Sequence, residues 1–134
     1  MARNVMIVGC GRVGAMVAKS LVERGDTVTV LDLDQDNFRR LTEGPNLRMV
    51  VADGTSNEDL QRHGIKQMDA FVCLTAQDTV NALAGQTAQL TFNVPTVVCR
   101  INDPIRRSMY EEAGLLTVSP PLVLTDLVLH ALER

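Results

Sequence analysis

VMIVGCGRVG, residues 5–14, is the stretch of this sequence that decides the fold. Its first four residues are apolar and mostly β-branched, as in a buried strand, and the pattern G-x-G-x-x-G follows with Gly9, Gly11 and Gly14. In such a pattern the first glycine permits a tight turn, the second lets phosphates approach the backbone, and the third lets a helix pack closely on the strand. Free N–H groups and the positive end of the helix dipole then favour a bound phosphate.

A helix is expected directly after the glycines, over residues 12–23, and Gly25 lies beyond its end. Side chains at helical spacing share one mostly apolar face, the kind that packs against a core: Val13, Met16, Val17, Ser20 and Leu21. About 20 residues after the glycines comes VTVLDLD, residues 28–34, so the segment from residue 5 to about 54 is predicted to be a nucleotide-binding βαβ unit.

The composition of the chain predicts one soluble domain over residues 1–134. The chain is 46% hydrophobic and 22% charged, with a net charge of −3. No run of basic residues points to nucleic acid, no apolar run is long enough to span a membrane, and the first strand starts too early to leave room for a signal peptide. Cys10, Cys73 and Cys99 have no CxxC spacing, which favours a reducing cytoplasm. Cys10 lies beside a helix N-terminus, a position that lowers the pKa of a thiol.

Short apolar runs alternate with helical patterns along the whole chain, which predicts an α/β fold with a doubly wound parallel sheet. Six strands are expected, at Val5–Val8, Thr27–Leu31, Arg48–Ala52, Ala70–Leu74, Thr96–Ile101 and Leu116–Ser119. Further helices are expected over residues 78–92, 103–114 and 122–132. Ser56 and Asp59 have the spacing of a capping box, while Asp103 and Pro104 open a helix that Gly114 closes.

Asp32 ends the second strand, where a carboxylate accepts hydrogen bonds from ribose hydroxyls. A negative charge there repels a 2′-phosphate, so NADP is disfavoured against NAD or another adenosine nucleotide. For Asp34, two residues later, capping of the next helix is favoured over direct ligand contact.

Other candidate ligand contacts stand at the ends of later strands. Asp53, Gly54 and Thr55 follow the third strand beside the expected place of an adenine, although a turn alone also explains Asp-Gly. Thr75 ends the fourth strand at the same edge. Arg100 is a charge inside an apolar strand and needs a partner: a nucleotide phosphate, an acidic neighbour or a facing subunit. Arg12, within the glycine loop, either reaches a terminal phosphate or is solvated, and Val13 beside it is a further candidate contact with the cofactor.

Groups for catalysis are missing from these strand ends. There is no Tyr-x-x-x-Lys pair, no P-loop and no His/Cys/acid cluster with metal-ligand spacing. Binding without turnover is the simpler interpretation, so the protein is predicted not to be an enzyme and to hold no metal. The alternative is a small NAD-dependent oxidoreductase, or the cofactor-binding half of one.

Six segments in order make the chain similar to a known family. They are GCGRVG, VLDLD, VVADGT, AFVCLTAQDTVN, VVCRINDP and EEAGLLTVSP. They resemble the N-terminal nucleotide-binding domain of potassium-transport regulators, the RCK or KTN family that includes the Trk-type uptake regulators.

The resemblance implies properties that the residues alone do not. Such domains bind NAD, NADH, ADP or ATP in the cytoplasm and form dimers and then rings, which open or close a membrane potassium channel or transporter. By position, Arg12 matches an arginine that meets the terminal phosphate across the dimer. The apolar face of the last helix matches a crossover helix exchanged between partners; without the resemblance it is only a core-facing helix.

Two departures from the family are visible. The sequence ends after the expected crossover helix, where the family commonly continues into a C-terminal ligand-binding subdomain, so we expect either an excised piece of a longer protein or a short regulator. Pro121 stands where some relatives place an acid that helps to hold a divalent ion between subunits, which argues against a metal there.

Overall fold

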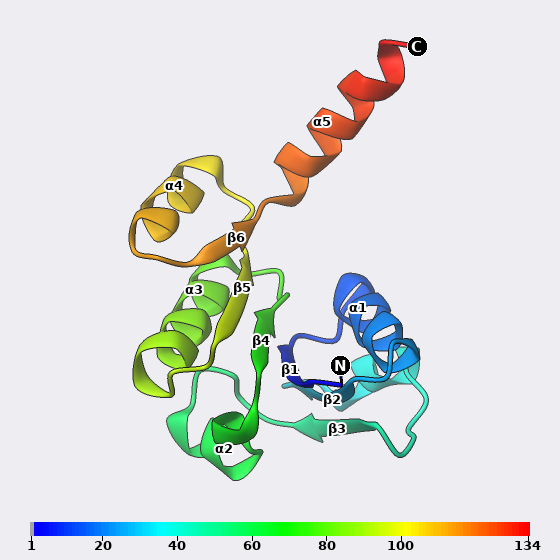
Figure 1. Cartoon of the computed structure of the whole chain (residues 1–134), viewed down its shortest axis with the longest axis vertical. Helices are drawn as coiled ribbons and strands as arrows, with labels where there is room; N and C mark the ends of the chain where they lie inside the picture. Colours follow the sequence, from blue (N-terminus) through cyan, green and yellow to red (C-terminus); the bar gives the residue numbers. More distant parts are fainter. Residues whose placement is uncertain (1) are drawn as a thin grey trace.

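The computed structural model describes residues 2–134 and contains one six-stranded sheet in which every pairing is parallel (Figure 1). The strands are β1 (Asn4–Val8), β2 (Thr27–Asp32), β3 (Leu47–Val51), β4 (Ala70–Cys73), β5 (Thr96–Arg100) and β6 (Leu116–Val118). Each expected strand is therefore confirmed, with ends displaced by no more than one residue. The order β3-β2-β1-β4-β5-β6 is that of a doubly wound Rossmann sheet.

The connections are helical. They comprise α1 (Arg12–Glu23), the 3₁₀-helices η1 (Gln35–Arg40) and η2 (Ile65–Gln67), α2 (Asn57–Arg62), α3 (Asp78–Gln86), a π-helical turn η3 (Thr87–Thr91), α4 (Pro104–Glu112) and α5 (Pro120–Leu132). The helix expected over residues 78–92 is thus α-helical only in its first part. The last helix starts earlier than expected, because prolines are tolerated in a first turn, where an N–H has no partner.

Helix ends follow the local signals in the sequence. The Ser56 hydroxyl accepts the Asp59 N–H at 3.2 Å, and Asp103 caps α4 by accepting the Ile105 N–H at 2.9 Å. Gly25 and Gly114 have positive φ just after α1 and α4. Asp34 caps η1 through the Asp36 N–H at 3.0 Å, which is the capping role favoured for it.

The sheet separates two hydrophobic cores, and α1 packs against one of them. Its buried residues are Gly14, Ala15 and Ala18, whereas Val13 is 48% and Met16 67% exposed. The expected core-facing side is therefore confirmed only in part: Val17 and Leu21 are half-buried and pack against the core, whereas Val13 and Met16 are exposed. The surface of α1 that lies closest to β1 carries small residues, because a Cβ at Gly14 would already overlap the Gly9 carbonyl.

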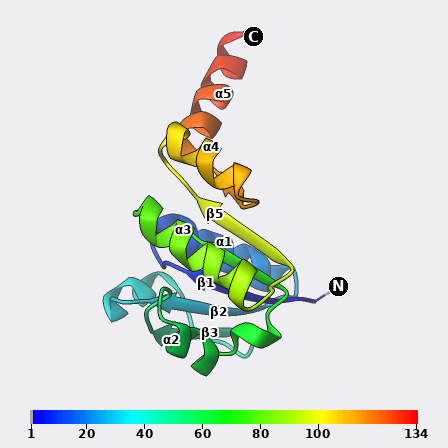
Figure 2. The ribbon, with the colours of Figure 1, turned by 90° about the vertical axis from the view of Figure 1, so that its left-hand side faces the viewer.

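Figure 1 and Figure 2 show α5 leaving β6 and extending away from the sheet. None of its residues is buried, and its exposed side chains include Leu124 and Leu127. Within the described residues, no helix combines the length and apolar character needed to cross a membrane.

Candidate functional site

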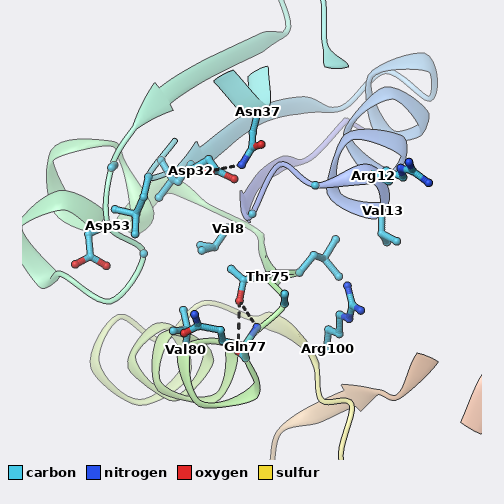
Figure 3. A pocket seen from close by; sticks show the side chains of 18 residues that line it. Val8, Arg12, Val13, Asp32, Asn37, Asp53, Thr75, Gln77, Val80 and Arg100 are labelled. Carbon is cyan, nitrogen blue, oxygen red and sulfur yellow. Dashed lines mark hydrogen bonds between the residues drawn. The ribbon is translucent and has the colours of Figure 1, made fainter. Parts of the chain in front are cut away.

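A cavity of about 430 Å³ opens where the strand order reverses, at the carboxyl ends of β1, β2 and β4 (Figure 3). Ligands of doubly wound sheets bind at this switch point. Most of the residues expected from the sequence line the cavity: Gly9, Gly11, Arg12, Val13, Asp32, Asp53, Gly54, Thr75 and Arg100. Gly14 and Thr55 do not line it. Apolar side chains complete the wall, from Val8, Leu31, Ala52, Leu74 and Val80.

The glycine loop is shaped by its contacts with neighbouring strands. Gly9 has φ +105°, and a Cβ there would lie 2.9 Å from the Thr75 nitrogen, so neither the backbone nor the space accepts a side chain. At Gly11, by contrast, an added Cβ would meet nothing within 4 Å. Gly11 is the N-cap residue of α1, and no side chain caps this end of the helix. The N-terminus of α1 therefore offers N–H groups and a positive dipole end to an anion.

The carboxylate of Asp32 also holds the glycine loop in place, a role that the sequence did not indicate. One oxygen accepts the Cys10 N–H at 2.7 Å, and the other accepts the Asp34 N–H at 2.8 Å and the Asn37 side-chain amide at 3.1 Å. A carboxylate offers about four acceptor positions. Roughly one acceptor position therefore remains for a ribose hydroxyl, whereas the sequence suggested hydrogen bonds from more than one hydroxyl.

Asn37 and Gln77 also line the cavity and were not expected. Asn37 lies in η1 and orients Asp32 through the amide hydrogen bond just described. The only sequence signal for it was the capping position at Asp34, which placed a helical turn directly after β2. Gln77 lies in the short turn between β4 and α3, where its N–H donates to the Thr75 hydroxyl at 3.2 Å.

The Thr75 hydroxyl is engaged by the protein itself. It donates to the buried Asn81 side chain at 2.7 Å and accepts the Gln77 N–H. Asn81 in turn donates to the backbone carbonyls of Thr75 at 3.0 Å and Arg100 at 2.8 Å, so it ties the end of β4 to the end of β5. Thr75 thus shapes the cavity wall, and its contact with a ligand stays a prediction.

The Asp53-Gly54-Thr55 segment is a tight turn. Asp53 accepts both the N–H and the hydroxyl of Thr55, at 2.8 and 2.7 Å, and these hydrogen bonds lower the pKa of Asp53. A Cβ at Gly54 would lie 2.5 Å from Val8, so this glycine permits close contact with β1. The turn explains all three residues locally, and a role for them in ligand binding stays a prediction.

The side chains of the two arginines at the cavity, Arg12 and Arg100, point in different directions. In Figure 3 the Arg100 side chain extends from the end of β5 toward the side of the cavity where Val13 lies, whereas Arg12 points away from Asp32 and Thr75. Arg100 donates through Nε to the Asn102 side-chain oxygen at 3.1 Å. Among residues 2–134, neither arginine forms an ion pair with a carboxylate within 4.0 Å.

The three cysteines are buried and free. Burial is the main reason why the pKa of Cys10 is raised, with the Asp32 charge adding to it, so the expectation of a lowered value was wrong. The helix dipole is outweighed because the thiol lies inside the loop, with its Sγ 3.5 Å from the Asn37 carbonyl. No group of three or more His, Cys, Asp or Glu side chains within residues 2–134 is placed to hold a metal.

Known proteins share both this sequence pattern and this fold. The model of the TrkA-N domain family matches residues 5–121. The Trk system potassium uptake protein TrkA of Streptomyces coelicolor is 36% identical over 129 residues, which cover 96% of this chain and 58% of that protein. The chain thus spans little more than half the length of this relative.

Three solved structures have the same fold. The TrkA-N domain of the inner membrane protein YbaL from Escherichia coli has a TM-score of 0.86 at 16% identity, and each chain is 98% covered. The Kef C-terminal domain of Shewanella denitrificans, in an AMP-bound form, has a TM-score of 0.78 at 19% identity, covering 97% of this chain and 80% of that one. GsuK bound to ADP has a TM-score of 0.80 at 21% identity, covering 98% and 34%. With the family model matched over most of its length, this chain belongs to the TrkA-N domain family.

Proposed function

We propose that this chain is a cytoplasmic nucleotide-sensing domain that regulates a potassium channel or transporter. Its cavity is proposed to take an adenine nucleotide with free ribose hydroxyls, ADP or ATP, NAD or NADH, and to disfavour NADP. The observation that carries the proposal is the uncapped N-terminus of α1, which faces a cavity that also contains Asp32 and an arginine without an acidic partner within residues 2–134.

Three parts of the cavity suit the three parts of an adenine nucleotide. Apolar side chains suit an adenine, the free acceptor position of Asp32 suits a ribose hydroxyl, and the glycine loop with Arg100 suits phosphates. Arg12 lies at the edge of the cavity with its side chain pointing away from Asp32 and Thr75, which fits a phosphate contact made from a neighbouring protomer. No step of this scheme needs a catalytic group, so the domain is proposed to bind without turnover.

The signal is proposed to pass through assembly. Residues 1–134 act as one domain, and the crossover segment of about 122–132 in α5 pairs with a second copy to form a homodimer, with four dimers in a ring. The ligand changes the relative stability of two arrangements of this assembly at the inner face of the membrane. The relative from Streptomyces, named as a potassium uptake protein, supports this proposal.

Calorimetric titration with ADP, AMP, ATP, NAD and NADP tests the ligand. Binding of at least one unmodified adenine nucleotide is expected, and NADP is expected to bind more weakly than NAD. In Asp32→Asn the ratio of NAD to NADP affinity should fall by about tenfold, because the charge that repels the 2′-phosphate is removed.

The control is Asp34→Asn, at a residue whose side chain caps η1 and which is not among the residues that line the cavity. Its NAD-to-NADP ratio should match that of the wild type. Failure of the folded wild-type protein to bind any of the five nucleotides would refute the proposed function.

A further inference from the structure

Asn102, two residues after β5, connects three parts of the fold. Its backbone N–H and its side-chain amide both donate to the carboxylate of Asp78, at 2.8 and 3.1 Å. Its side-chain oxygen accepts from Arg100 at 3.1 Å, and its carbonyl accepts the Ser119 hydroxyl at 3.3 Å. All four of its hydrogen-bonding groups are therefore used, each by a residue of another segment or of the cavity wall.

The carboxylate of Asp78 holds Asn102 from the side of α3. Asp78 starts α3, and its second oxygen accepts the Asp103 N–H at 3.0 Å, so both residues at the start of the β5–α4 connection are held by one carboxylate. Burial alone would raise the pKa of Asp78, but the N–H groups of Asn102 and Asp103, with Arg106 nearby, bring it below its ordinary value. The ionised form is therefore the one that holds Asn102.

The hydroxyl of Ser119 links Asn102 to the base of α5. This serine is only 2% exposed and is the N-cap residue of the helix. Its carbonyl accepts the Val123 N–H at 3.0 Å, the hydrogen bond that closes the first turn. A displacement of Asn102 therefore changes the support of the residue from which α5 starts.

Arg100 links Asn102 to the cavity. Its guanidinium lines the cavity, while its Nε is held by Asn102. An anionic phosphate accepts hydrogen bonds more strongly than a neutral amide oxygen does. A phosphate that binds the Nε side of Arg100 therefore competes directly with Asn102 for the same N–H.

We propose that Asn102 couples occupancy of the cavity to the base of α5. A ligand phosphate that engages Arg100 frees the side-chain oxygen of Asn102, while the amide nitrogen stays on Asp78. The resulting shift of Asn102 passes through its carbonyl to the Ser119 hydroxyl and so to the first turn of the helix. The inference rests on the proposed function, since it requires an anionic ligand at Arg100. It adds to that function a positioning residue and a route by which the ligand reaches α5.

Hydrogen exchange with and without ADP tests the coupling in the assembly that the chain forms. In the wild-type protein, saturating ADP should change the exchange rate of the Val123 and Leu124 amides by about threefold or more. In Ser119→Ala this response should disappear, because the link to Asn102 is removed without altering a residue that lines the cavity. The ADP affinity of this variant should stay within about tenfold of the wild type, which is roughly the most that one ordinary hydrogen bond supplies through reciprocal coupling.

The matched control is Ser108→Ala, which removes a hydroxyl bonded only to the Pro104 carbonyl within α4 and should keep the full response. Asn102→Ala should lose the response and bind ADP more tightly, because the side-chain oxygen that competes with the phosphate for the Arg100 N–H is removed. If ADP binds but Val123 and Leu124 do not respond, or respond equally in Ser119→Ala, the coupling is refuted and the nucleotide site stands. If the wild type binds no nucleotide, the proposed function and the coupling are both refuted.

Discussion

Asp32 shows how one side chain serves the loop as well as a ligand. Its hydrogen bonds to Cys10, Asp34 and Asn37 hold the glycine loop against the end of β2. An acid at this position therefore organises the cavity before anything binds there. Substitutions of Asp32 consequently need a ratio of two affinities as readout, because a displaced loop weakens every ligand alike.

Asp78 carries a pH-dependent contribution to stability. Burial would raise its pKa, but the hydrogen bonds from Asn102 and Asp103 and the charge of Arg106 lower it overall. A carboxyl group with a lowered folded-state pKa stabilises the fold above its unfolded-state pKa of about 4, and this stabilisation is lost as the pH falls through the folded value. Asp78→Asn should lower the free energy of unfolding at pH 7 by about 1–3 kcal/mol and lose less stability than the wild type below pH 4.

Urea unfolding between pH 3 and pH 7 measures both effects, with pH steps near about 4, where an aspartate titrates. Asp126→Asn, on the exposed surface of α5, is the control and should follow the wild-type curve. A parallel pH dependence of Asp78→Asn and the wild type would contradict the assignment.

At the scale of elements, the strands could be predicted because each is a short apolar run bounded by glycine, proline or polar residues. The face of α1 could be predicted only in part: Leu21 packs against the core as expected, but hydrophobicity also favours Met16 and takes no account of distance to the sheet. Contact with Gly9 and β1 requires small residues instead. Likewise no motif assigns a role to Asn37, or to Asn102 within the segment VVCRINDP, and both acquire their partners only when η1 and the β5–α4 connection are in place.

Two substitutions in α1 distinguish the two faces. Met16→Gln should change the free energy of unfolding by less than about 0.5 kcal/mol, because this side chain is 67% exposed. Ala18→Leu should cost about 1–3 kcal/mol, because Ala18 is fully buried between the helix and the sheet. Chemical denaturation measures both, and a larger loss for Met16→Gln than for Ala18→Leu would restore the interpretation from the sequence.

At the scale of the whole molecule, α5 is not explained by the folded domain of a single chain. The helix has 13 residues, a length that is marginal for a helix in water without packing, and none of its residues is buried. Its exposed leucines form an apolar surface of the kind that marks an interaction site. The family resemblance, and no local pattern, suggested that a second copy covers it.

Self-association is therefore expected to depend on α5. Replacing Leu124 and Leu127 together by glutamate should convert the protein from a dimer, or larger assembly, to a monomer, because both side chains are more than half exposed in the single chain and two charges would be buried in the interface. Neither residue supports the core of its own chain, so the monomer should keep the cavity, but it should bind ADP and ATP more weakly because it lacks the proposed phosphate contact from Arg12 of a neighbouring protomer. Leu90→Glu, at an exposed leucine in η3, is the control and should leave the α5-dependent dimer intact. Sedimentation velocity over a range of concentrations decides the matter, and a wild-type protein that stays monomeric throughout would mean that a different partner covers α5.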